Sequence, residues 1–174
     1  MVEAARDWHK EMLNGLQVPG PSFVGKFRGE AGIAENWEVK IGGHSCVEAA
    51  QVADELTQFQ ATLRRVVAYL DEHLPPDAEP VADDIAAILD LCAWVHAEWA
   101  RIHPFMNGNG RTARLWANSL AMRYGLPPFV RLRPRPHGGY ADAGKRAMRG
   151  EWEPTATVFF QMFRDFLDET DGGD

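Results

Sequence analysis

Two long stretches with apolar residues at helical spacing constrain this chain more than any other feature of its sequence. In residues 47–74 the apolar side chains recur largely at intervals of three and four: Val52, Leu56, Phe59, Leu63, Val66, Val67 and Leu70. Residues 83–102 repeat the pattern: Ile85, Ile88, Leu89, Cys92, Val95, Trp99 and Ile102. The first helix should end before Pro75, and Asp83 and Asp84 suit the start of the second because acidic side chains favour a helix N-terminus.

Two further helices complete a mainly α architecture. One is expected over residues 111–124, where Gly125 supplies a stop signal, and a last one over about 154–168. The six tryptophans, including Trp94, Trp99 and Trp116, fall at helical spacings and are expected in the core.

A short β-hairpin is predicted before the helical core. Residues 23–30 alternate weakly in polarity, residues 37–41 alternate cleanly, and turn-forming residues fill 29–36. Since a pair of strands is barely stable alone, we expect this hairpin to rest on the helices or to act as a flap.

Length and composition indicate one globular domain over residues 1–174 with an ordinary core. A net charge of −7 argues against nucleic acid as the main ligand. The N-terminal residues lack the pattern of a signal peptide, and no apolar run approaches the roughly 20 residues that cross a membrane, so we expect a cytoplasmic protein. Two cysteines, Cys46 and Cys92, indicate no disulfide framework.

The segment His103-Pro-Phe-Met-Asn-Gly-Asn-Gly-Arg-Thr-Ala-Arg114 carries the chemistry. Gly108 and Gly110 let backbone N–H groups turn in one direction, and the following helix adds its positive dipole end, so the loop is suited to bind phosphate. Arg111 and Arg114 lie three residues apart on one helix face and can hold further phosphate oxygens. Together they suit a di- or triphosphate.

His103 is the candidate general base, because an imidazole can accept a proton from an attacking hydroxyl at neutral pH. Pro104 and Phe105 are read as structural supports. Asn109 can donate to a phosphate oxygen or stabilise a turn. Each of these residues alone is uninformative, and only their combination indicates a site.

This segment resembles the signature of the Fic family, His-x-Phe-x-(Asp or Glu)-Gly-Asn-Gly-Arg-x-x-Arg, over a Fic-type core of about residues 20–165. The resemblance implies an adenylyltransferase that uses ATP and Mg²⁺ to modify a Ser, Thr or Tyr hydroxyl of a target protein. It implies His103 as the base and a phosphate-binding set of Gly108, Asn109, Gly110, Arg111 and Arg114. It also places Tyr140 near the nucleobase, and the target along the flap at about residues 23–41.

One position departs from the signature. Asn107 stands where the family has a carboxylate that helps to bind the metal, so the resemblance implies a weaker Mg²⁺ ligand there. The chain also lacks any Ser or Thr followed at the fourth position by Glu, the family's inhibitory pattern. This resembles members that are unrestrained, or that are toxins inhibited by a separate small antitoxin.

Two alternatives stay open at this point. The Doc branch transfers the terminal phosphate instead, but it has Lys where Gly110 stands here. The second is a nucleotide-binding or protein-interaction module without catalysis, against which the presence of His103 argues. A basic run over residues 131–135 could contact nucleotide or target, or be a solvated loop.

Overall fold

The computed structural model describes residues 1–33, 38–74 and 79–171 of the chain. Its helices are α1 (Val2–Leu13), α2 (Val52–His73), α3 (Ala82–Ile102), α4 (Asn109–Arg123), α5 (Tyr140–Ala147) and α6 (Glu153–Asp171). Short 3₁₀ turns cover Pro21–Phe23 and Ala49–Gln51, and two strands, β1 (Lys40–Ile41) and β2 (His44–Ser45), pair antiparallel. The predicted mainly α fold is confirmed.

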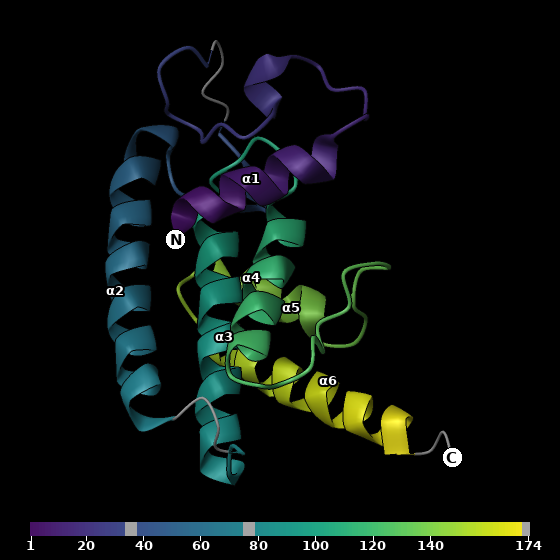
Figure 1. Cartoon of the computed structure of the whole chain (residues 1–174). Helices are drawn as coiled ribbons and strands as arrows, with labels where there is room; N and C mark the ends of the chain where they lie inside the picture. The colour runs from purple at the N-terminus through teal and green to yellow at the C-terminus, as the bar shows by residue number, and fades with distance from the viewer. Residues whose placement is uncertain (34–37, 75–78, 172–174) are drawn as a thin grey trace.

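Helix α3 is the centre of the bundle and contacts α2, α4, α5 and α6. Figure 1 shows α2 on one side of it, α4 beside it, α5 and α6 behind, and α1 lying across the end where α3 stops and α4 starts. A helix in the centre of a bundle is covered by its neighbours on most of its surface. This explains why the apolar residues of α3 are spread around the helix, with Leu91, Cys92 and Ala93 all buried.

The apolar stripe predicted for α2 forms its core face. Six of its members are buried: Val52, Leu56, Phe59, Leu63, Val67 and Leu70. Phe59 stacks on Trp94 and contacts Trp99 and Trp116, so the three tryptophans belong to the core as expected. Cys92 is also a core residue, whose Sγ lies 3.2 Å from the Ala117 carbonyl and whose pKa burial raises to about 12.

The hairpin exists, but its predicted pairing is wrong. Among the described residues, 23–30 do not pair with 38–41, and residue 37 of the predicted second strand lies outside the described residues. The strand β1 instead pairs with β2 across Gly42 and Gly43, both with positive φ (56° and 86°). A two-residue turn of that kind matches the twist of paired strands and strongly favours Gly-Gly, so the turn signal was in the sequence.

Residues 25–30 act as a support between α1 and the motif loop. Phe27 forms an isolated antiparallel bridge with Phe105, and Phe105 is fully buried. Phe105 therefore pins the loop to the core, as predicted. Two helices were not predicted: α1, which contacts α4, and the short α5, which begins at Tyr140.

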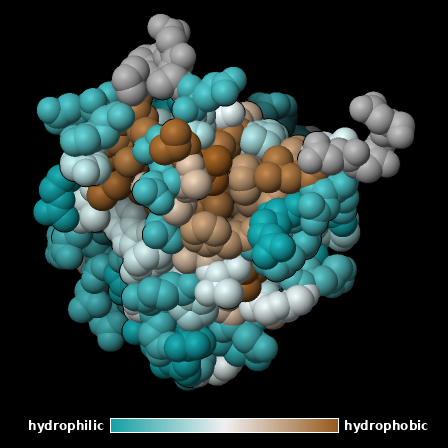
Figure 2. All heavy atoms as spheres, turned by 90° about the horizontal axis from the view of Figure 1, so that it is seen from below, coloured by the Kyte–Doolittle hydropathy of each residue, from teal (hydrophilic) through white to brown (hydrophobic). Residues whose placement is uncertain are grey.

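Within the described ranges, no helix combines the length and apolarity needed to cross a membrane. The face seen from below, opposite the motif loop, carries a band of hydrophobic atoms bordered by hydrophilic ones (Figure 2).

Candidate functional site

His103 ends α3 in a left-handed backbone conformation, with φ 54° and ψ 55°. It is the single non-glycine residue with positive φ in the described part of the chain. Such a conformation is strained for a residue with a side chain and persists only where neighbours enforce it. The ring is oriented as well, since Nδ1 lies 3.1 Å from the Ala100 carbonyl. A carbonyl can only accept, so Nδ1 carries the proton and Nε2 keeps its lone pair.

Arg28 enforces that backbone. Its guanidinium is buried and donates to three carbonyls, those of His103 (2.8 Å), Ile102 (2.9 Å) and Val47 (2.7 Å). Its backbone N–H donates to the Pro104 carbonyl at 2.7 Å. The last carbonyls of a helix have no partner within the helix, and Arg28 satisfies two of those at the end of α3. Residues 25–30 thus fix where His103 sits.

The imidazole of His103 is neutral at physiological pH. Burial, together with the nearby cation Arg28, lowers its pKa to about 4, against the opposing effect of the hydrogen bond to Ala100. A neutral ring with a free Nε2 can take a proton. An anion bound nearby would raise this pKa again, because negative charge favours the imidazolium form.

Helix α4 starts directly after the loop with two N–H groups available. Gly108 is its N-cap, with φ 79°, and the Gly108 carbonyl accepts from the N–H groups of Arg111 and Thr112. The N–H groups of Asn109 and Gly110, at the first two helical positions, have no backbone acceptor among the described residues. Such orphan donors at the positive end of a helix dipole form an anion site.

Of the two roles considered for Asn109, the structure shows the turn-stabilising one. Its side chain is buried, its Oδ1 accepts from the Phe105 N–H, and its Nδ2 donates to the Phe105 carbonyl, both at 2.8 Å. The side chain therefore closes the loop on itself.

The arginines beside this helix start form a cationic cluster. Arg114 is buried, and it donates through Nη1 to the Tyr140 hydroxyl at 3.2 Å and through Nη2 to the Leu132 carbonyl at 3.1 Å. Its Nε has no partner among the described residues. Burial lowers the pKa of Arg111, and Arg133 and Arg114 lower it further.

No described carboxylate forms an ion pair with any arginine of this cluster: Arg111, Arg114, Arg133 and Arg135. The net negative chain thus concentrates uncompensated positive charge here, which suits a polyanionic ligand.

Tyr140 and His96 complete the wall beside Arg114. The Tyr140 hydroxyl lies 2.7 Å from His96 Nε2, and Arg135 stands over the Tyr140 ring at 5.5 Å. Burial and the two arginines lower the pKa of His96 to about 3, so this histidine is neutral. Tyr140 is buried and presents its hydroxyl to the arginine cluster.

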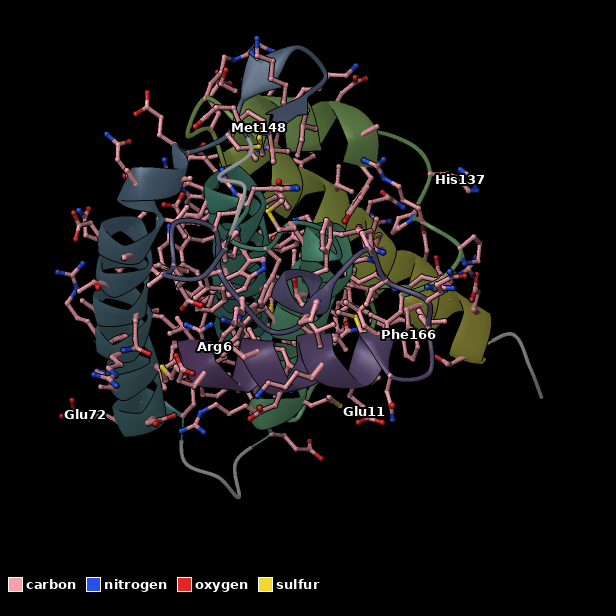
Figure 3. The ribbon with its side chains drawn as sticks, turned by 90° about the horizontal axis from the view of Figure 1, so that it is seen from above. Arg6, Glu11, Glu72, His137, Met148 and Phe166 are labelled. Atoms are coloured by element: carbon pink, nitrogen blue, oxygen red, sulfur yellow. The ribbon has the colours of Figure 1, made fainter. Side chains whose placement is uncertain are left out.

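One cleft of about 500 Å³ collects these groups. Its lining joins the candidate base, the loop, the arginines and part of the hairpin: Val39, Lys40, Ile41, His96, Ala100, His103, Asn107, Gly108, Asn109, Gly110, Arg111, Arg114, Arg135, Tyr140, Gly144 and Met148. The structure thus brings every predicted site residue to one place. Figure 3 shows Met148 beneath the hairpin, while His137 points away from the body of the protein on the loop before α5.

Asn107 does not provide a metal site by itself. Its Oδ1 accepts from the Gly108 N–H at 2.6 Å, and its carbonyl lies 2.9 Å from His9 Nε2. The described residues contain no group of three or more His, Cys, Asp or Glu side chains that could hold a metal ion. The side chain of Asn107 offers a neutral oxygen, which is a poorer ligand for Mg²⁺ than a carboxylate.

Three buried residues of the site were not assigned there from the sequence: His9, Arg28 and His96. Nothing in their local sequence separates them from surface residues, because each acts on a segment far along the chain. The sequence signal for burial is a helical position next to apolar neighbours, as for His96 between Val95 and Ala97.

Comparison with known proteins identifies relatives of this chain. The model of the Fic/DOC family matches residues 2–121. A protein adenylyltransferase Fic of Aedes aegypti is 30% identical over 141 residues, which cover 81% of this chain and 24% of that protein. Its counterpart in Nematostella vectensis is 30% identical over 105 residues, covering 52% of this chain and 24% of that protein. The chain therefore spans about a quarter of the length of these relatives.

A solved structure has the same fold. BepC, an effector protein of Bartonella tribocorum crystallised with AMPPNP bound, superposes with a TM-score of 0.66 at 18% sequence identity. The match covers 92% of this chain and 72% of that one. The Fic-type bundle expected from the motif is confirmed.

Proposed function

Since this chain belongs to the Fic/DOC family, we propose that it is a protein adenylyltransferase, which moves AMP from ATP to a hydroxyl group of another protein. One observation carries the proposal: the same cleft is lined by a neutral histidine, by a helix start whose first N–H groups have no described acceptor, and by two arginines without a described carboxylate partner. The names of the relatives and the ATP analogue bound to BepC support it.

His103 is the proposed general base. The target hydroxyl oxygen attacks the α-phosphorus of ATP, and its proton passes to Nε2 of His103. A bond forms between that oxygen and phosphorus, the bond from phosphorus to the bridging oxygen breaks, and pyrophosphate leaves with the electron pair. Because Nδ1 of His103 is held by Ala100, the ring does not need to reorient during the reaction.

The loop and the arginines stabilise the phosphates in this proposal. The N–H groups of Asn109 and Gly110 face negative charge on the phosphate oxygens, with the dipole of α4 behind them. Arg111 and Arg114 hold the remaining oxygens, and Tyr140 lies at the side where the nucleoside would continue. These donors are in place before the nucleotide arrives, so little reorganisation is needed.

Mg²⁺ enters this proposal with the nucleotide. The described residues contain no group of three or more His, Cys, Asp or Glu side chains that could hold a metal, so in this proposal the phosphates of ATP supply most of its ligands and Asn107 contributes at most a neutral oxygen. Binding and orientation of the phosphates rest on the N–H groups and the arginines.

The target is proposed to dock along the hairpin. Val39, Lys40 and Ile41 line the cleft, and β2 pairs with only one edge of β1. An extended segment of the target can add to the other edge and present its hydroxyl to His103. The docking segment is then residues 39–41, the end of the longer flap expected over 23–41.

A separate small antitoxin remains part of the proposal, in which this chain is the toxin.

The test is transfer of label to protein. Wild-type chain and the His103→Ala variant are incubated with Mg²⁺, a cell lysate and ATP labelled at the α-phosphorus, and proteins are separated by electrophoresis. We expect a labelled target with the wild type and at least a hundredfold less with the variant, since a general base contributes about 10²–10⁴-fold. His73→Ala, at the exposed end of α2, is the control and should label like the wild type.

The other outcomes are equally informative. Label from the γ-phosphorus alone would indicate phosphotransfer of the Doc kind. No label from either position would favour a nucleotide-binding module. An isolated chain that becomes active only when one of its own glutamates is replaced would rule out restraint by a separate antitoxin.

A further inference from the structure

His9 lies far from the motif in sequence but in contact with it in space. It is fully buried on the face of α1 that covers the motif loop. Its Nδ1 accepts from the Gly25 N–H at 3.0 Å, so Nδ1 cannot carry a proton. Its Nε2 lies 2.9 Å from the Asn107 carbonyl, which can only accept, so Nε2 carries the proton. Both ring nitrogens are thus used, and the two bonds fix a single neutral tautomer.

The ring of His9 is also packed against the loop on both sides of Asn107. It stacks on Phe105 with centroids 4.0 Å apart and planes inclined by 12°. On the other side it fills the space that a side chain at Gly108 would need, since a Cβ there would come within 3.1 Å of the His9 ring atoms. Gly108 is therefore required for its backbone conformation and for the approach of His9.

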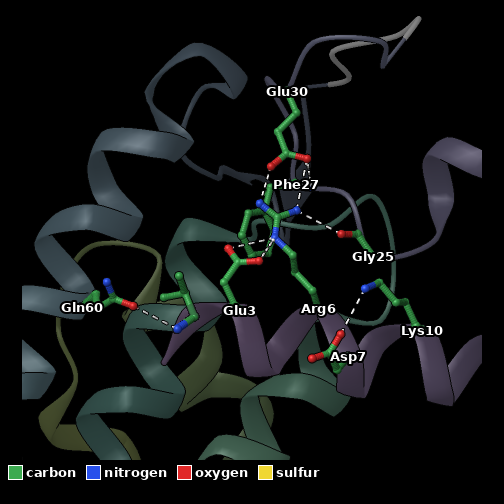
Figure 4. A network of polar contacts seen from close by, with 9 residues as sticks. Glu3, Arg6, Asp7, Lys10, Gly25, Phe27, Glu30 and Gln60 are labelled. Carbon is green, nitrogen blue, oxygen red and sulfur yellow. Dashed lines mark hydrogen bonds and ion pairs between the residues drawn. The ribbon is translucent and has the colours of Figure 1, made fainter.

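Helix α1 holds this histidine from a rigid position. One turn before it, Arg6 donates to the Gly25 carbonyl and pairs with Glu30, and its guanidinium lies 3.6 Å from the centre of the Phe27 ring (Figure 4). These contacts tie α1 to residues 25–30, the same segment that supplies Arg28 to the end of α3. His9 and His103 are consequently held by one support.

We infer that His9 is a positioning residue for the phosphate-binding loop, through the hydrogen bond from its Nε2–H to the Asn107 carbonyl. That bond fixes the peptide plane between Asn107 and Gly108, where α4 begins. The plane sets the direction in which the next N–H groups, those of Asn109 and Gly110, point into the cleft. The inference rests on the proposed function only in taking a nucleoside triphosphate as the ligand.

Two substitutions separate this role from simple packing. In His9→Gln the side-chain amide reaches the place of Nε2 and can still donate to Asn107, but the acceptor for Gly25 is lost. In His9→Asn the amide oxygen takes the place of Nδ1 and can still accept from Gly25, but the donor to Asn107 is lost. Each variant loses the stack on Phe105 and one hydrogen bond, so their unfolding temperatures should be similar.

The experiment compares the amide resonances of Gly108, Asn109 and Gly110 in the full chain and the Kd for Mg·ATP. We expect His9→Asn to shift these resonances and to weaken ATP binding about tenfold, as one lost hydrogen bond predicts. His9→Gln should keep the resonances near those of the wild type and bind ATP within about threefold. Equal effects of the two variants, or none, would overturn the inference and leave His9 a packing residue.

The resonances also separate this inference from the proposed function, because they are measured without nucleotide. A chain that binds ATP but transfers no AMP would refute the transferase and leave the role of His9 standing. Should either variant fail to fold, the protonation of the two ring nitrogens of His9 in the wild type tests the inference instead. Protonated Nε2 with unprotonated Nδ1 near neutral pH supports the inference, and a proton on Nδ1 overturns it.

Discussion

The two halves of the motif loop are built in opposite ways. In residues 103–107 four of the five backbone carbonyls have a partner among the described residues. Arg28 donates to the first two, those of His103 and Pro104, and His9 donates to that of Asn107. In residues 108–114 the N–H groups of Asn109 and Gly110 and the Nε of Arg114 have no described partner.

The difference separates a half whose geometry is fixed by internal hydrogen bonds from a half that has donors available for a ligand. Buried polar groups without partners are costly, so a protein retains them where a ligand completes them. The first half, held by internal bonds, orients the proposed base His103, while the second half leaves donors for the proposed anionic ligand. Substitutions that affect the first half should therefore lower the free energy of unfolding, and substitutions in the second half should weaken ligand binding.

The largest effect should come from Arg28→Met in the closed half. Three carbonyls at and near the end of α3 would lose their donor while remaining buried, and we expect a loss of about 2–4 kcal/mol in the free energy of unfolding. Urea titration followed by tryptophan fluorescence measures it. Arg64→Met on the exposed face of α2 is the matched control, for which the expected change is within about 0.5 kcal/mol. Similar values for both variants would contradict the support assigned to Arg28.

A smaller effect, measured on ligand affinity, is expected from Arg114→Met in the open half. Removing a charge-assisted contact to phosphate should weaken binding of Mg·ATP by about tenfold to a hundredfold, as measured by calorimetry. Arg123→Met, at the opposite end of α4 and paired there with Asp71, provides the control. If ATP affinity were unchanged in the Arg114 variant, the open half would not be the phosphate site.

The smallest effect concerns Asn107, which stands at the border of the two halves. In Asn107→Asp a carboxylate can still accept from the Gly108 N–H and adds the charge that Mg²⁺ prefers. We expect the Mg²⁺ concentration for half-maximal transfer to fall by a few-fold, as a single exposed charge predicts. Asn14→Asp, at the end of α1, controls for the added charge. An unchanged Mg²⁺ requirement would show that the phosphates of ATP hold the ion without help from this position.

Local patterns predicted much of this protein. The apolar stripes located α2 and α3, and the spacing of Gly108, Gly110, Arg111 and Arg114 located the site. Prediction failed where the signal was short or where partners were distant. Polarity alternation predicts a hairpin over 23–41, whereas the observed strands turn at Gly42-Gly43, and α5 is too short for a periodic signal because its eight residues span barely two turns.

The sequence alone determined that this chain is a helical domain with a loop suited to phosphate, because helical periodicity and turn chemistry depend on neighbours along the chain. Only the tertiary structure decided how the loop is held. His9, Arg28 and His96 look ordinary in sequence, and they acquire their roles by lying 98, 75 and 44 residues from the groups they contact. Burial decided their chemistry as well, since it holds all three histidines of the site neutral and leaves the arginines as the charge that a nucleotide would meet.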